Sequence, residues 1–136
     1  GGFEYIPQLK IFDCIVKVKD RRNRIEDYNV ESIWVNKNIS EKDFRKLHSF
    51  FWLFTIDLKS SKKITRSVIS NWTNLNQNYS FKSWELDTLS KRVISWIANS
   101  NSFYHEGDEN FKINFVNILK KQLNHLTNEI GNTEFV

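Results

Sequence analysis

The sequence predicts an all-α fold, and three observations carry that prediction. Apolar residues recur at spacings of three and four residues in four separate segments, which is the period of an amphipathic helix. Short polar connections that contain capping residues separate these segments. The chain holds only one Pro and four Gly, too few for a turn-rich β-sandwich. Its 136 residues, 40% apolar and 15% aromatic, suffice for one domain with a buried core.

The first predicted helix, residues 41–58, is densely aromatic and is expected at the centre of the domain. Ser40 precedes it as an N-cap, and Asp43 follows three residues later, where a carboxylate favours a helix N-terminus. The residues at helical spacing are Phe44, Leu47, Phe51, Phe54 and Leu58. Phe50 and Trp52 widen this apolar arc, so the helix is expected to pack against neighbours on several sides.

The second predicted helix follows a polar and basic turn at residues 59–63. Ser60 or Ser61 can cap this helix, which is expected to end near Asn76, within the polar stretch 74–80. Its apolar face consists of Ile64, Val68, Ile69, Trp72 and Leu75.

Two further amphipathic helices complete the predicted set. Ser83 is the expected N-cap of the third helix, residues 84–99, and Asp108 that of the fourth, which is expected to end at Gly131. The apolar face of the third helix is Leu86, Leu89, Val93, Trp96 and Ile97. That of the fourth includes Phe111, Phe115, Ile118, Leu119, Leu123, Leu126 and Ile130, with Gln122 beside them. Four helices joined by short connections imply antiparallel neighbours.

The segments that flank this helical domain, residues 40–131, are expected to differ from it. Residues 1–39 are predicted to be irregular, with a short extended stretch at 11–18, and residues 132–136 form a tail. Trp34 lies in the connection before the first helix and is expected to plug the core of the domain that follows. The chain has no Met and begins Gly-Gly, which suggests either a fragment of a longer protein or a processed chain.

Charge and composition narrow the possible partners. The formal net charge of +4 is compatible with an acidic polymer, whether nucleic acid or glycan. The densest basic run, residues 17–24, is either a solvated loop or a patch for phosphate, sulfate or carboxylate groups. It has no interleaved aromatic residues, which disfavours nucleic acid. The single cysteine, Cys14, excludes an internal disulfide, and no apolar run is long enough to cross a membrane.

Candidate functional residues are sparse. The histidines do not stand in a metal-binding spacing, and there is no glycine-rich phosphate loop, so no metal or other cofactor and no self-contained catalytic set is predicted. His48 is either a core histidine with a satisfied hydrogen bond or a residue that lines a pocket. Trp84 at a helix start can face a cleft, with Asp87 and Arg92 on the same helix. An aromatic face beside a guanidinium suits a sugar ring that bears a carboxylate or sulfate, although tryptophans can equally be core.

These residues resemble the N-terminal part of the heparinase II/III family, over residues 40–130. The matching pattern is Leu47-His48-x-Phe50-x-Trp52-Leu53, Asp57-Leu58, Trp72, Trp84-x-x-Asp87-x-Leu89-x-x-Arg92-x-x-x-Trp96-Ile97 and Lys120-Lys121-Gln122-Leu123 with Leu126. The order and spacing of these motifs carry the resemblance, whereas each one alone is degenerate. In part of the family Tyr-Asn precedes the Leu-His pair, where this chain has Arg45-Lys46.

The resemblance implies helical hairpins that form part of an (α/α) toroid, with a β-sandwich domain downstream in the parent chain. Such proteins are polysaccharide lyases that cleave uronic-acid-containing glycans by β-elimination. Their catalytic Asn, Tyr and His come from later segments, so this chain alone is expected to be inactive. The resemblance implies substrate-binding roles only for His48, Trp84, Asp87 and Arg92, with an acidic polysaccharide as the partner.

Two other functions stay open. A basic helical module could bind nucleic acid or a protein partner, with nucleic acid the less favoured of the two because of the composition of the basic run. The chain could also be a helical scaffold without a ligand of its own. If it is part of a toroid, four helices leave an apolar flank uncovered, which predicts marginal stability or self-association.

Overall fold

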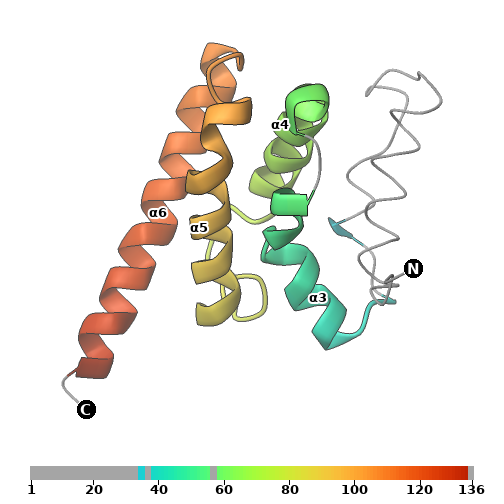
Figure 1. Cartoon of the computed structure of the whole chain (residues 1–136). Coiled ribbons are helices and arrows are strands. Elements are labelled where there is room, and N and C mark those ends of the chain that lie inside the picture. Colours follow the sequence, from blue (N-terminus) through green and yellow to red (C-terminus); the bar gives the residue numbers. More distant parts are fainter. Residues whose placement is uncertain (1–33, 36–37, 56–57, 135–136) are drawn as a thin grey trace.

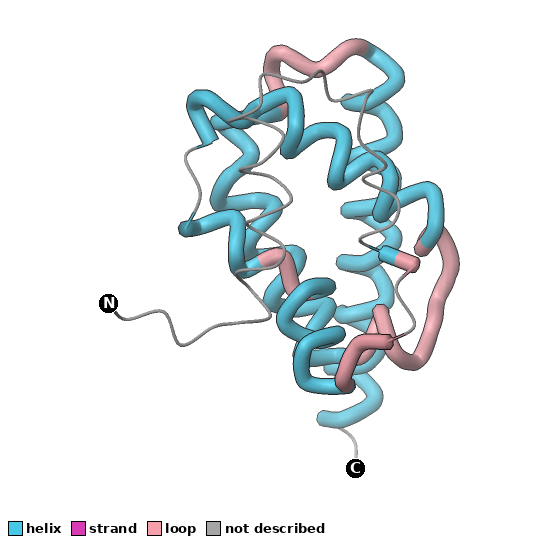
Figure 2. Tube along the Cα trace, turned by 90° about the vertical axis from the view of Figure 1, so that its right-hand side faces the viewer, coloured by secondary structure: helices cyan, strands magenta, loops and turns pink. Residues whose placement is uncertain are grey.

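The computed structural model describes residues 34–35, 38–55 and 58–134, and it is helical throughout these ranges apart from short connections (Figures 1 and 2). Its helices are α3 (Glu41–His48), the 3-10 helix η2 (Phe51–Thr55), α4 (Leu58–Leu75), α5 (Leu86–Phe103) and α6 (Glu109–Glu134). The described residues contain no strand, which confirms the predicted all-α class for this part of the chain. The predicted extended stretch at 11–18 and the basic run at 17–24 lie outside the described residues.

The aromatic segment is not one helix, so the prediction of a continuous helix over residues 41–58 is wrong. α3 begins as predicted, because the Ser40 hydroxyl accepts a hydrogen bond from the Asp43 backbone amide at 3.1 Å. It ends at His48, and Phe50 then takes a left-handed backbone conformation with φ of 58°. The chain continues as η2, so that α3 and η2 stand in place of residues 41–55 of the predicted helix.

Burial explains the break at Phe50. A left-handed conformation costs a residue with a Cβ about 1–2 kcal/mol, whereas full burial of a phenylalanine gains about 1.5–3 kcal/mol. The Phe50 side chain is completely buried and stacks on Trp52 with ring centroids 5.3 Å apart. Both rings reach the same core because the chain turns between them, whereas side chains two apart on a straight helix point in different directions.

α4 begins at Leu58. Residues 59–63 are therefore helical, and the prediction of a turn there is wrong. Its predicted apolar face is otherwise confirmed, since Ile64, Val68, Ile69 and Trp72 are all buried. Leu75, the last predicted member of that face, is 43% exposed. Among the residues of α4 whose burial is described, the buried ones lie between Ile64 and Thr73.

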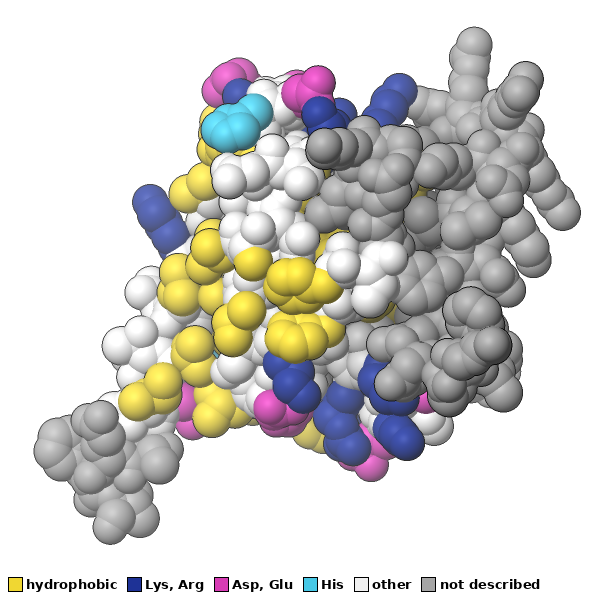
Figure 3. All heavy atoms as spheres, viewed as in Figure 1, with side chains coloured by type: hydrophobic (Ala, Val, Ile, Leu, Met, Phe, Trp, Pro, Cys, Tyr) yellow, Lys and Arg dark blue, Asp and Glu magenta, His cyan; other side chains and the backbone are white. Residues whose placement is uncertain are grey.

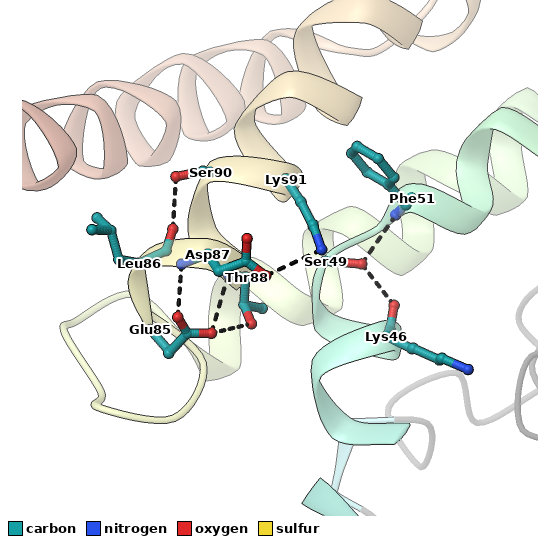
Figure 4. A network of polar contacts seen from close by, with 9 residues as sticks. All are labelled: Lys46, Ser49, Phe51, Glu85, Leu86, Asp87, Thr88, Ser90 and Lys91. Atoms are coloured by element: carbon teal, nitrogen blue, oxygen red, sulfur yellow. Dashed lines mark hydrogen bonds and ion pairs between the residues drawn. The ribbon is translucent and has the colours of Figure 1, made fainter. Parts of the chain in front are cut away.

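α5 is capped by Glu85 and not by Ser83, which is buried in the preceding connection (Figure 4). The Glu85 carboxylate accepts hydrogen bonds from the backbone amides of Asp87 at 2.7 Å and Thr88 at 3.2 Å. Partial burial acts to raise the pKa of this carboxyl, but these hydrogen bonds outweigh it and the pKa is lowered. The helix extends to Phe103, beyond the predicted end at residue 99, and Leu89, Val93 and Trp96 lie in the core as predicted.

α6 begins as predicted, with the Asp108 carboxylate accepting a hydrogen bond from the Phe111 amide at 2.8 Å. It does not end at Gly131, because the helix continues to Glu134. A side chain at Gly131 would meet nothing within 4 Å, so no packing contact requires glycine there. The buried face of α6 is Phe111, Phe115, Ile118 and Gln122.

The three long helices run antiparallel in chain order and pack on one another, as predicted from the short connections (Figure 1). α3 and η2 pack mainly against α5. Trp34 plugs the core as predicted, with 8% of its surface exposed and its ring stacked on Phe50 at 5.1 Å. None of the helices, within the described ranges, is long and apolar enough to span a membrane.

Several apolar side chains of α5 and α6 remain exposed, and Figure 3 shows apolar atoms gathered over these two helices. They are Leu86, Ile94 and Ile97 on α5 and Ile113, Leu123 and Ile130 on α6, each at least 37% exposed. Exposed apolar surface of this kind promotes association. The prediction of self-association therefore has a candidate surface.

We expect the double substitution Ile94→Lys and Ile97→Lys to reduce self-association, because two charges would have to be buried in any contact made through α5. Light scattering over a concentration series measures the effect. Leu75→Lys, at an exposed position of α4, is the matched control. If the double variant has the same average molar mass as the unchanged chain, any self-association is made through a surface other than this face of α5.

Candidate functional site

The four candidate site residues lie in two different environments. His48, Trp84 and Arg92 are buried, with exposed fractions of 3%, 4% and 0%. Asp87 is exposed at the start of α5, where it pairs with Lys91 at 3.1 Å (Figure 4). The structure thus brings His48 and Arg92 together in the interior, and it does not present the four side chains on one open surface. The outward-facing orientation considered for Trp84 is not observed.

Arg92 is the hub of the buried polar contacts. Its Nε donates a hydrogen bond to Gln122 Oε1 at 2.6 Å, and its Nη1 donates to the backbone oxygens of His48 and Ser83, both at 2.9 Å. The guanidinium carbon lies 4.2 Å from the centroid of the Trp72 ring. One side chain of α5 therefore links α3, α4, α6 and the connection between α4 and α5.

The guanidinium of Arg92 has no carboxylate partner within the described part of the chain, although buried charges are usually paired. Neutral oxygens and the face of Trp72 stabilise it instead. Burial lowers the pKa of Arg92 to about 9. The side chain is consequently committed to the interior and does not reach a ligand at the surface.

His48 accepts a hydrogen bond at Nδ1 from Trp72 Nε1 at 2.9 Å. The ring also stacks on Phe44, with centroids 3.9 Å apart. Burial, and then the nearby charge of Arg92, lower the pKa of His48 to about 3. The imidazole is therefore neutral at ordinary pH with its Nδ1 lone pair occupied, as expected for the core alternative.

The buried aromatic residues of the family resemblance, with His48 and Arg92, meet in one cluster although they are spread along the chain, whereas its members Asp87, Ile97 and Leu123 are exposed. Trp72 packs edge-to-face on Trp96 at 5.4 Å, and Phe50 contacts both rings. Trp52 Nε1 donates to the Leu47 oxygen at 3.0 Å, and Trp84 Nε1 to the Asn76 oxygen at 3.1 Å. The pattern therefore marks the framework that holds the helices together.

A groove of about 580 Å³ lies between α4 and α6. Its polar lining includes Ser67, Ser70, Asn71 and Asn74 of α4, Asn110 and Asn114 of α6, and the charged residues Lys63, Arg66, Glu106 and Asp108. Phe111, Phe115 and Ile69, all buried, form its floor. This groove was not predicted from the sequence. The available signal was the pairing of asparagines three and four residues apart, which places them on one helix face.

A second hollow, of about 700 Å³, lies beside α3 and the connection before α5. It is lined by Trp34, Val35, Ile39, Glu41, Phe44, Arg45, Phe81, Lys82 and Glu85. Residues 36–37, which interrupt this lining segment, lie outside the described residues. Neither hollow resembles a metal centre, since the described residues contain no group of three His, Cys, Asp or Glu side chains able to hold an ion.

Comparison with known proteins adds no relative. No protein-family model, no curated protein and no solved structure matches the chain. The likeness to the heparinase II/III family is therefore a resemblance in motif residues alone.

Proposed function

We propose that this chain is the N-terminal helical part of a heparinase II/III-like polysaccharide lyase. In this role it forms part of an (α/α) toroid and helps hold an acidic, uronic-acid-containing glycan for β-elimination. The observation that carries the proposal is the convergence of the buried motif residues, among them His48, Trp96 and Gln122, on one cluster around Arg92 and Trp72. A pattern that is degenerate in sequence thus has one physical role in three dimensions.

The order of the helices supports the toroid. α4, α5 and α6 are consecutive antiparallel helices that pack on one another, which is the arrangement of stacked helical hairpins (Figure 1). The exposed apolar side chains of α5 and α6 would be covered by the next hairpin of such an array. The proposal therefore accounts for both the core and the uncovered face.

The chemistry of the described residues supports a role in holding the glycan without cleaving it. β-Elimination needs a group that removes the proton next to the carboxylate and one that protonates the leaving oxygen. His48 is buried with Nδ1 occupied, and Arg92 is enclosed by the core. These two residues, with Trp84, would act on the glycan only indirectly, by fixing the positions of the helices whose surfaces contact it.

The test combines binding and turnover on the 136-residue chain. Isothermal titration with a hyaluronan oligosaccharide is expected to show binding, while absorbance of the unsaturated product is expected not to rise. Single-stranded DNA of equal charge is the control ligand, and its binding should be weaker and lost steeply with salt. Formation of unsaturated product would contradict catalytic incompleteness. Absence of hyaluronan binding, or tighter binding of DNA, would contradict the glycan role.

A further inference from the structure

The groove between α4 and α6 is unusual in the kind of side chains it gathers. Besides Thr73, whose hydroxyl bonds to the Ile69 oxygen, four carboxamides and two hydroxyls line it, those of Asn71, Asn74, Asn110, Asn114, Ser67 and Ser70. Carboxamides and hydroxyls can each donate and accept hydrogen bonds. Within the described residues none of these six side chains, which belong to α4 and α6, has a hydrogen-bond partner. On α5, by contrast, Ser90, Asn99 and Ser100 bond to backbone oxygens of their own helix. The groove therefore holds a large unused capacity for hydrogen bonding.

The charged residues of the groove balance one another and lie toward one end. Lys63 and Arg66 are matched by Glu106 and Asp108. Glu106 pairs with Lys62 at 2.7 Å, Arg66 donates to the Phe103 oxygen at 3.1 Å, and Asp108 caps α6. These charged groups are already engaged within the chain, so the groove has little net attraction for a polyanion.

The uncharged side chains continue the groove away from that end. α4 and α6 run in the same direction, so their later residues lie progressively farther from the charged end (Figure 1). Ser70, Asn71 and Asn74 are the later lining residues of α4, and Asn114 is that of α6. The buried Phe115 lies beneath them as an apolar floor. A ligand that fits here carries many neutral donors and acceptors around an apolar ring face, which describes a sugar.

From this lining we infer that the α4–α6 groove is a carbohydrate-binding groove that holds sugar units through their hydroxyl and acetamido groups and not through their carboxylates. The inference rests on the proposed function for the kind of polymer and goes beyond it in the site and the groups recognised. It places glycan contact on residues outside the motif cluster. The groove volume, about 580 Å³, is within the range of small-molecule sites.

The experiment compares two ligands that differ only in whether their uronic acid units carry carboxylates or alcohols. The 136-residue chain is titrated with a hyaluronan octasaccharide and with the same oligosaccharide after reduction of its carboxylates to alcohols. Both are expected to bind with similar affinity, and neither affinity should fall steeply with salt, because uncharged groups make the contacts. The double variant Asn71→Ala and Asn114→Ala should weaken binding of both by about tenfold or more, since it removes at least two neutral hydrogen bonds, which together contribute about the 1.4 kcal/mol that a tenfold change in affinity represents.

Two further variants serve as a control outside the groove and as a second test of the groove. Asn124→Ala removes an exposed asparagine of α6 that does not line the groove, and it should leave both affinities unchanged. Asn74→Ala with Asn110→Ala is a second groove pair at exposed positions, for use if the first double variant loses its helical circular dichroism. This pair is also expected to weaken both ligands.

The outcomes separate the groove from the proposed function. Binding of the native oligosaccharide that neither groove variant weakens would overturn the groove while leaving the glycan role intact. Binding of the native but not the reduced oligosaccharide would also overturn it, because carboxylates would then be the recognised groups. Binding of the reduced oligosaccharide alone would support the groove and overturn the acidic glycan as partner. Failure of both ligands to bind would overturn both ideas.

Discussion

Replacing Arg92 with alanine is expected to remove most of the stability of this domain. The substitution deletes a fully buried side chain together with three hydrogen bonds, and it leaves the oxygens of His48, Ser83 and Gln122 without their donor. Each buried oxygen left without its donor costs about 1–3 kcal/mol, so the loss of all three hydrogen bonds is expected to cost about 3 kcal/mol or more. Domains of this size are stable by about 5–15 kcal/mol, so the loss is a large fraction of the total.

Chemical denaturation followed by circular dichroism measures the effect, with Lys91→Ala as the matched control. Lys91 is the preceding residue on α5, exposed and paired with Asp87, and its loss should change the free energy of unfolding by less than about 1 kcal/mol. Arg92→Met separates the loss of packing volume from the loss of the charge and its hydrogen bonds. Methionine fills part of the space but still leaves the three oxygens unpaired, so it should remain far less stable than the unchanged chain.

A small effect of Arg92→Ala would contradict the hub assigned to this residue. Stability of Arg92→Met equal to or above that of the unchanged chain would show that the buried charge costs as much as its hydrogen bonds return. Either result would remove the main physical reason why the motif residues from four parts of the chain are found together.

The helices were predictable to the extent that local pattern determines them. Ser40 and Asp108 were recognised as caps because the capping contact is made within three residues of the chain. The break at Phe50 was not, because its cause is the burial of that side chain against Trp34, Trp72 and Trp96, which are distant in sequence. Periodicity alone continues a helix through such a point.

The candidate site was less predictable for a related reason. The spacing of Arg92 and Trp96 shows that they share one side of a helix, but not whether another helix covers that side. α6 covers it through Gln122, thirty residues further along, and Arg92 becomes a core residue. The groove between α4 and α6 was missed because its two walls come together only in the folded chain. Sequence pattern indicated the faces, and long-range packing determined their roles.

Lowering the pH is expected to destabilise the fold through His48, beginning near neutrality. Burial, followed by the charge of Arg92, lowers the pKa of His48 to about 3 from an ordinary value of 6.5. Below pH 6.5 the unfolded chain therefore binds a proton at this position that the folded chain does not. Above pH 6.5 the contribution of His48 to the free energy of unfolding should not change with pH. As the pH is lowered from 6.5 to the folded-state pKa, the free energy of unfolding should decrease by about 1.4 kcal/mol per pH unit.

The contacts of His48 also disfavour its protonated form, as burial does. Protonation of Nδ1 would replace the lone pair that accepts the Trp72 hydrogen bond with a second donor, and it would add a positive charge close to Arg92. Glu85 and Glu106 also have lowered pKa values, but from 4.5, so their loss of stability comes at lower pH. The interval between pH 6.5 and 5 is therefore the one that reports on His48, with an expected loss of about 2 kcal/mol.

Denaturation midpoints measured every half unit between about pH 7.5 and 5, in the unchanged chain and in His48→Gln, test this mechanism. Glutamine can accept the Trp72 hydrogen bond through its side-chain oxygen but does not titrate, so the variant should lose the slope while remaining folded. Its stability at pH 7 should be lower, because the stacking on Phe44 is lost. His125→Gln, at a partly exposed position, should keep the slope. Equal slopes in the unchanged chain and in His48→Gln would assign the acid sensitivity to other groups and leave His48 as an ordinary packing residue.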